Sequence, residues 1–115
     1  MALEHLTQTT FKEKVFNYEA NKEWKYEGTA PAIIDFYADW CGPCKIMAPV
    51  LDSFAADHTG EILVGKVDTE AAPAVSARYG IRGIPTLILY RDGTEVGRQT
   101  GAVARPGLDQ LVSVL

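Results

Sequence analysis

The fold is decided by the stretch Ala32-Ile33-Ile34-Asp35-Phe36-Tyr37-Ala38-Asp39-Trp40-Cys41-Gly42-Pro43-Cys44. Its first seven residues form a continuous apolar run with one acid, Asp35, a pattern typical of a parallel-sheet strand that helices cover on both faces. A helix is expected to start after Cys41, because Pro43 suits the first helical turn, where its missing N–H is no loss. The stretch therefore predicts a buried strand, a short turn that carries cysteines, and a helix.

The composition is that of an ordinary globular protein. The chain has 115 residues, 47% hydrophobic and 23% charged, which predicts a single domain over residues 1–115. The net charge is −4 and the basic residues are scattered, so no nucleic-acid partner is expected. The apolar runs are far shorter than a membrane span, and Met1 to Leu6 lacks a signal-peptide pattern. We therefore expect a cytoplasmic protein without membrane contact, and a monomer.

The segments on both sides of the opening stretch alternate between strand and helix patterns. Upstream, Leu3 to Leu6 is a candidate strand, and a helix capped by Thr9 or Thr10 is expected to run to about Tyr18. Downstream, the helix that starts after Cys41 is expected to run to about His58, with Pro49 inside it. The elements expected after it are a strand Ile62 to Asp68, a helix Ala72 to Tyr79, strands Thr86 to Arg91 and Thr94 to Thr100 around Asp92-Gly93, and a helix Arg105 to Leu115. The order βαβαβαββα predicts an α/β fold, a central mixed β-sheet with helices on both faces.

Cys41 and Cys44 are the only cysteines in the chain, and their spacing fits two kinds of chemistry. They can close and open a small disulfide ring, or they can supply half of a zinc site. Zinc would need two more ligands, and the only histidines are His5 and His58, the latter at the far end of the helix that starts near Cys44. The same shortage counts against a hydrolase with a Cys–His pair. A redox pair is therefore favoured, with no metal.

The two sulfurs are expected to differ in environment. Cys41 precedes the helix, so the unpaired N–H groups and the positive end of the helix dipole favour its thiolate form. Cys44 lies in the first turn and is expected to point into the protein. An exposed sulfur at Cys41 and a buried one at Cys44 predict a nucleophile and a resolving thiol. Gly42 and Pro43 between them carry no charge, which favours a reductant over an oxidant.

Two charged residues are expected in or near the interior. Asp35 is the single acid of its strand, and burial makes a lone carboxyl hold its proton more tightly than usual. The strand runs toward the cysteines and the helix runs back, which places Asp35 beneath them, nearer Cys44. Lys66, in the next strand, either neutralises Asp35 or buries only its stem and extends its ammonium to solvent.

The segment Asp35 to Lys45 resembles the active-site segment of the thioredoxin family. Pro49, Gly65-Lys66-Val67-Asp68, Tyr79-Gly80-Ile81-Arg82-Gly83-Ile84-Pro85-Thr86 and Gly101-Ala102 follow in the family's order and at roughly its spacing, so the resemblance covers Ala32 to Leu115. Tyr37 stands where the family usually has Trp, a mild change. The segment Asn17 to Gly28, with Trp24 and Tyr26, is longer than the family's usual connection. It is either a loop held by these two aromatic residues or a contact for a partner.

The resemblance implies a thioredoxin fold and a protein-disulfide reductase. The Cys41 thiolate would attack a disulfide in a target protein, and Cys44 would resolve the mixed disulfide, leaving a redox-active Cys41–Cys44 disulfide. Asp35 would accept the proton of Cys44 through water, or else is a hydrogen-bonded structural residue. The resemblance also implies a cis bond before Pro85, which would otherwise be taken as the start of a strand.

The resemblance further implies a flat substrate-binding surface around Cys41. Its residues would be Trp40, Gly42, Pro43, Gly83, Ile84, Pro85, Gly101 and Ala102. Small residues there let a substrate backbone approach, and Ile84 beside a cis bond would have a backbone free to pair with an extended segment. Trp40 alone fits a partly buried packing residue equally well. Asp39 and Lys45 are expected to be solvated charges.

The partners implied by the resemblance are disulfide-containing target proteins and an NADPH-dependent thioredoxin reductase. The chain has no nucleotide-binding glycine pattern, so it is expected to hold no cofactor and to receive its electrons from that reductase. Two alternatives stay open. One is a disulfide oxidant or isomerase, which needs an oxidising compartment, and the other is a non-catalytic binding subunit that uses the same surface.

Overall fold

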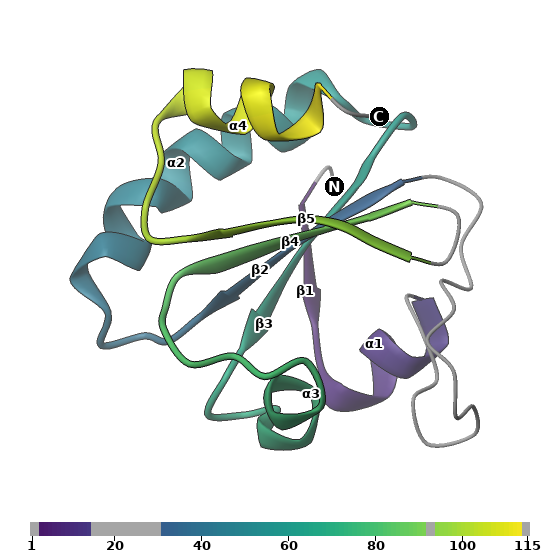
Figure 1. The fold of residues 1–115 in the computed structure, drawn as a ribbon, viewed down its shortest axis with the longest axis vertical. Helices are drawn as coiled ribbons and strands as arrows, with labels where there is room; N and C mark the ends of the chain where they lie inside the picture. The colour runs from purple at the N-terminus through teal and green to yellow at the C-terminus, as the bar shows by residue number, and fades with distance from the viewer. Residues whose placement is uncertain (1–2, 15–30, 92–93, 114–115) are drawn as a thin grey trace.

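A computed structural model of the chain describes residues 3–14, 31–91 and 94–113. Within these ranges, five strands form one mixed sheet in the order β1-β3-β2-β4-β5 (Figure 1). Their bounds are Leu3–Leu6 for β1, Ala32–Tyr37 for β2, Leu63–Asp68 for β3, Thr86–Arg91 for β4 and Thr94–Thr100 for β5. β3 pairs in parallel with β1 and β2, whereas β4 is antiparallel to β2 and β5. The strand that carries Asp35 is thus the central one.

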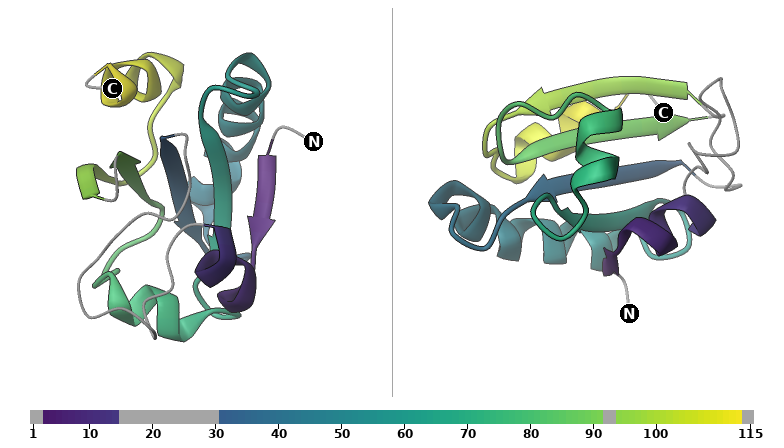
Figure 2. Two further views of the ribbon diagram at one scale, coloured as in Figure 1. Left: turned by 90° about the vertical axis from the view of Figure 1, so that its right-hand side faces the viewer. Right: turned by 90° about the horizontal axis from the view of Figure 1, so that it is seen from below.

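Helices cover both faces of this sheet (Figures 1 and 2). Their bounds are Gln8–Lys14 for α1, Gly42–Asp57 for α2, Pro73–Arg78 for α3 and Arg105–Val112 for α4. α2 and α4 lie on one face, and α1 and α3 lie on the other. The predicted element order and the predicted mixed sheet between two layers of helices are both confirmed.

The pleat of β2 sends successive side chains to opposite faces, which builds two apolar cores. The core beneath α1 and α3 contains Ile34 and Phe36 of β2 with Phe11, Val75, Tyr79 and Tyr90. The core beneath α2 and α4 contains Ile33 with Met47, Leu51, Phe54, Leu87 and Leu108. By the same alternation Asp35 lies on the face of Ile33, under α2, and so on the side of the sheet from which the cysteines project.

The start of α1 differs from the prediction by two to three residues. Thr7, and not Thr9 or Thr10, caps the helix, because its Oγ1 accepts the backbone N–H of Thr10 at 3.1 Å. The Oγ1 of Thr10 accepts the backbone N–H of Thr7 at 2.7 Å in return. Such a reciprocal pair satisfies two N–H groups at a helix start. The sequence offers three threonines within four positions, and only geometry separates them. The expected continuation to Tyr18 lies outside the described residues.

The other element bounds agree closely with the pattern. α2 contains Pro49 as expected and ends at Asp57, with His58 as its C-cap. β3 begins one residue later than predicted, at Leu63, and the predicted ends of the third helix, Ala72 and Tyr79, are the caps of α3. β4 and β5 match their predicted bounds and pair as a hairpin. Asp92-Gly93, Leu115 and the segment Asn17 to Gly28 lie outside the described residues.

Candidate active site

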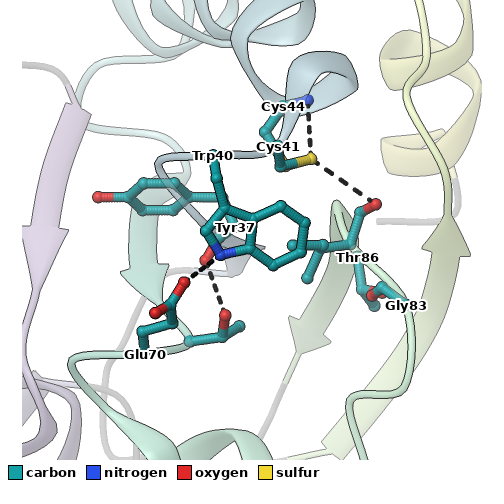
Figure 3. The surroundings of a disulfide bond; sticks show 9 residues. Tyr37, Trp40, Cys41, Cys44, Glu70, Gly83 and Thr86 are labelled. Carbon is teal, nitrogen blue, oxygen red and sulfur yellow. Dashed lines mark hydrogen bonds between the residues drawn. A yellow bond between two sulfur atoms is a disulfide. The ribbon is translucent and has the colours of Figure 1, made fainter.

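Cys41 is the N-cap residue of α2. Its backbone is extended, with φ −82° and ψ 111°, and its sulfur accepts the backbone N–H of Cys44 at 3.2 Å (Figure 3). The two cysteines form a disulfide with their Cα atoms 5.3 Å apart. The predicted helix start is confirmed, with Gly42 and Pro43 in its first turn. The Cys41 sulfur therefore lies where the helix presents an unpaired N–H and the positive end of its dipole.

The predicted difference in exposure between the two cysteines is wrong. Cys41 and Cys44 are each 4% exposed, and both lie in a small apolar cluster with Ala38, against which Tyr37 and Ile84 pack. Cys41 is covered because the loop before Pro85 passes close by, with the carbonyl oxygen of Ile84 3.9 Å from its sulfur. What distinguishes the two sulfurs is their place relative to α2, since only Cys41 lies outside the helix.

The loop that faces Cys41 has the predicted cis bond between Ile84 and Pro85. The carbonyl oxygen of Pro85 accepts the backbone N–H of Gly101 at 2.8 Å, and Gly101 has a left-handed φ of 98°. Buried Thr86 donates its hydroxyl to the carbonyl oxygen of Gly83. These contacts bring Gly83, Ile84, Pro85 and Gly101 together beside the cysteines. Of the remaining predicted contact residues, Gly42, Pro43 and Ala102 are exposed.

Trp40 is 70% exposed, and its indole N–H donates to the carboxylate of Glu70 (Figure 3). Glu70 is in turn fixed by Asp68, whose Oδ1 accepts the backbone N–H groups of Glu70 at 2.9 Å and Ala71 at 3.4 Å. Trp40 is therefore a surface residue held in one orientation and is not a packing residue. Sequence reasoning missed Glu70. The available signal was an Asp two residues before it, which favours a side-chain turn after a strand.

Asp35 is buried, with 1% of its surface exposed. Burial raises its pKa from an ordinary 3.8 to about 7, and the positive charge of Lys66 opposes that rise. Its Oδ1 has no hydrogen-bond partner. The prediction that Asp35 holds its proton tightly is confirmed. The missing partner also counts against a purely structural role, because buried structural carboxylates are normally hydrogen-bonded.

Lys66 lies directly opposite Asp35 in the parallel register of β2 and β3. Its Nζ lies 4.3 Å from the centroid of the Tyr37 ring, where a cation is attracted by the ring face. Among the described residues, Lys66 forms no ion pair with Asp35. The structure thus places the ammonium over an aromatic ring, a position that neither sequence alternative included. It still lowers the pKa of Asp35 through space.

A pocket of about 100 Å³ opens beside Cys44 on the same side of the molecule. Tyr37, Cys44 and Lys66 line it, together with Ala38, Asp39, Lys45 and Ala48. The side chains of Asp39 and Lys45 are exposed, as predicted for solvated charges. The pocket gives the surroundings of Cys44 a route to solvent that its small exposed area does not suggest.

Other kinds of site receive no support in the described part of the chain. No three side chains among its His, Cys, Asp and Glu residues come together as metal ligands. None of the helices at residues 3–14, 31–91 and 94–113 is long and apolar enough to cross a membrane. The cysteine pair with its surroundings is therefore the candidate site.

Comparison with known proteins agrees with this geometry. The family model described as thioredoxin matches residues 2–114. The chain is 39% identical to thioredoxin 1 of Nostoc sp. over 95% of its length and 92% of the relative, and 40% identical to thioredoxin 1 of Synechococcus elongatus over 90% and 87%. It is 41% identical to the chloroplastic M-type thioredoxin of Spinacia oleracea over 76% of its length and 48% of the relative.

The match extends beyond the cysteine pair. It runs over nearly the whole chain, and the structure has the five-stranded mixed sheet and the closed Cys41–Cys44 disulfide that the resemblance implies. The chain belongs to the thioredoxin family and is a thiol–disulfide oxidoreductase that reduces disulfides in other proteins.

Proposed function

We propose that Cys41 is the attacking thiol of this reductase and Cys44 the resolving one. In the first step the Cys41 thiolate attacks one sulfur of a target disulfide, forms a mixed disulfide and releases the other target sulfur as a thiolate. In the second step the Cys44 thiolate attacks the Cys41 sulfur, closes the Cys41–Cys44 disulfide and releases the second target thiolate. Two electrons pass from the dithiol to the target, and the target thiolates take up protons.

The observation that carries this assignment is the N-cap position of Cys41. A thiolate there gains the hydrogen bond that the Cys44 N–H already makes to the sulfur, and it gains the favourable field of α2. Cys44 lies inside the first turn of the helix, and its own backbone N–H is the group that donates to the Cys41 sulfur. The site therefore supports one sulfur as the stable thiolate and the other as the thiol that must lose a proton.

Asp35 is the proposed proton acceptor for Cys44. A pKa of about 7 suits a base that works near neutral pH, because the group then exchanges protons readily in both directions. Asp35 lies on the α2 face of the sheet and has an oxygen without a hydrogen-bond partner. The pocket of about 100 Å³ beside Cys44 has room for a water on the Cys44 side of such a relay, and its lining includes Lys66, the register neighbour of Asp35, but not Asp35 itself. Lys66 tunes this base from its place over Tyr37.

The proposed substrate-binding surface surrounds the recessed disulfide. It consists of Trp40, Gly42, Pro43, Gly83, Ile84, Pro85, Gly101 and Ala102. An extended target segment that pairs with the backbone at Ile84 would bring its own sulfur beside Cys41, since the Ile84 carbonyl oxygen is 3.9 Å from the Cys41 sulfur. Trp40, exposed and held by Glu70, would supply apolar contact area.

The proposal extends to partners and location. Electrons would reach the disulfide from an NADPH-dependent thioredoxin reductase, because a dithiol that is consumed in each cycle needs a regenerating partner. The chain would act as one domain and as a monomer. It would work in the cytoplasm, where its transfer of electrons to target disulfides keeps the cysteines of those targets reduced. A reducing compartment suits this pair, since close cysteines there are more often catalytic than structural.

The test is a comparison of two single-cysteine variants with a small protein that has one accessible disulfide. Cys44→Ser should accumulate a covalent mixed disulfide with the target, visible by mass spectrometry and released by a small thiol. Cys41→Ser should form none at neutral pH, even though it keeps one thiol. The assignment fails if Cys41→Ser traps the target as fast as Cys44→Ser.

The reduction potential separates a reductant from an oxidant. Measured against glutathione, the Cys41–Cys44 pair is expected in the range typical of thioredoxins, about −270 mV, and not near the roughly −120 mV of strong oxidants. A value at the oxidising end would contradict the proposed direction of electron flow, from Cys41 and Cys44 to the target disulfide.

A further inference from the structure

A groove of about 210 Å³ lies next to the disulfide, on the side of Trp40 and Ile84. Trp40, Ile81 and Ile84 give it apolar walls, and Thr69 and Ser76 add hydroxyl groups. The indole of Trp40 is held by Glu70, so this wall has a defined position (Figure 3). A groove with fixed walls can discriminate between the side chains that enter it.

The groove also borders the proposed path of the substrate. Ile84 lines it and at the same time presents its carbonyl oxygen to the Cys41 sulfur at 3.9 Å. A target segment that lies along Ile84 to reach Cys41 must therefore cover part of the groove. The side chains that flank the target cysteine are the groups that would enter it.

Arg82 is the one lining residue of this groove with an ionisable side chain. It is exposed, and within residues 3–14, 31–91 and 94–113 it has no hydrogen-bond or ion-pair partner. Arg98 and Arg105, by contrast, are bound to Glu95 and to Asp57 and Asp109. In a chain with a net charge of −4, the lining of the groove beside the disulfide thus carries one positive charge, Arg82, and no acidic side chain.

The complement of this lining is an acidic side chain on the target. Glu70 accepts the indole N–H of Trp40, one wall of the groove, but it does not itself line the groove. Arg82 precedes Ile84 by two residues. The two residues lie in the loop before β4, and two positions of chain span at most about 7 Å, a distance that an extended target segment covers with about two of its own residues.

We infer that Arg82 is a specificity-determining residue, which favours target segments that carry Asp or Glu about two residues from the reactive cysteine on the side that covers the groove. This inference rests on the proposed function, because it assumes that the target sulfur is delivered to Cys41 along Ile84. A guanidinium suits this task, since it can form two parallel hydrogen bonds with a carboxylate.

The experiment uses synthetic peptides with a single cysteine, each joined by a disulfide to the same small thiol. They differ at one position only, either two residues before or two residues after the cysteine. That position is occupied by Glu, Gln or Lys. The second-order rate of reduction by the dithiol form of the protein is measured at low ionic strength. For one of the two positions, the disulfide of the Glu peptide should be reduced about two- to fivefold faster than that of the Gln peptide, as expected for an exposed ion pair. The disulfide of the Lys peptide should be reduced more slowly than that of the Gln peptide.

Arg82→Gln should remove this preference, and Arg82→Glu should reverse it. Arg91→Gln is the charge control, because it removes the same charge from an exposed residue at the end of β4, away from the groove lining, and should keep the preference. Added salt at about 0.5 M should weaken the preference in the unmodified protein, because it screens exposed charges.

Two failures are distinguishable. If the Gln peptides are reduced but the Glu peptides have no advantage on either side, or Arg82→Gln keeps the full advantage, the inference is overturned and the proposed roles of Cys41 and Cys44 stand. If no peptide is reduced, both are overturned.

Discussion

Asp35 and Lys66 lie opposite one another in the register of β2 and β3, yet the described part of the chain shows no ion pair between them. The lysine ammonium lies over the ring of Tyr37 instead. The carboxyl therefore experiences a positive charge through space without a direct contact. This arrangement keeps the pKa of Asp35 near 7, whereas a close ion pair would draw it down.

Removal of the Lys66 charge should raise the pKa of Asp35 above its present value of about 7, because burial would then act alone. Lys66→Met is the suitable variant, since Met replaces the stem with apolar atoms. The carboxyl carbon of Asp35 can be titrated by NMR in the oxidised protein. Lys45→Met, which removes an exposed lysine of the same pocket, should leave the titration almost unchanged. Equal shifts in the two variants would contradict a special role for Lys66.

Tyr37 should control the position of Lys66, and its loss should change the pKa of Asp35 in the opposite direction to the loss of Lys66. Tyr37→Leu removes the ring that attracts the ammonium. The ammonium is then free to approach the carboxylate, and the pKa of Asp35 should fall. Tyr37→Phe keeps the ring face and should resemble the unmodified protein in the same NMR titration. A pKa that does not distinguish Leu from Phe at this position would show that the ring does not hold Lys66.

Ionisation of Asp35 should make the stability of the protein depend on pH. The folded-state pKa of about 7 lies above the ordinary 3.8, so the folded state holds a proton that the unfolded chain releases. The stabilisation is fully present below pH 3.8 and is lost as the pH rises through 7. The shift corresponds to about 4 kcal/mol of unfolding free energy between these limits.

Urea denaturation of the oxidised protein from pH 4 to 9 measures this effect. Asp35→Asn cannot ionise, so the difference in unfolding free energy between the two proteins should change by up to about 4 kcal/mol in favour of the variant as the pH rises. The oxidised protein is used because cysteines joined in a disulfide do not titrate and so add nothing to the pH dependence of the unfolding free energy. A difference that is constant with pH would exclude a raised pKa at Asp35.

Gly101 should tolerate a side chain poorly, although it has space for one. A Cβ added there meets no atom within 4 Å, but the φ of 98° is a conformation that L side chains rarely adopt. Gly101→Ala should therefore lower the unfolding free energy by about 1 to 3 kcal/mol through backbone strain. Gly42→Ala is the control, because its site is equally open and its φ is not left-handed. Calorimetry that finds equal losses in both would refute the backbone explanation.

Much of this fold was predictable because its signals are local. The apolar run of β2, the Asp92-Gly93 signal between β4 and β5, and Pro43 at the start of α2 each follow from short patterns. The cis bond before Pro85 was predictable only from the family resemblance, since cis bonds are a small minority before proline. The sequence was least informative where several residues of one type compete, as with Thr7 and Thr10.

The missed features of the site depend on contacts between distant segments. Glu70 reaches Trp40 across 30 residues of sequence, and Ile84 covers Cys41 across 43. No periodic pattern reports such a contact, because each partner alone looks like an ordinary surface or loop residue. The same holds for Lys66, whose two predicted alternatives omitted the ring of Tyr37.

The burial of both cysteines, at 4% exposure each, has a kinetic consequence. A sulfur that solvent barely touches reacts rarely with small thiols that meet it by chance, since they bring no binding energy of their own. A target protein that first binds the surrounding surface keeps its sulfur near Cys41 through many possible reactive encounters. The choice between competing thiols then depends on residence time and not on collision frequency, so an abundant small thiol need not outcompete a scarce protein partner.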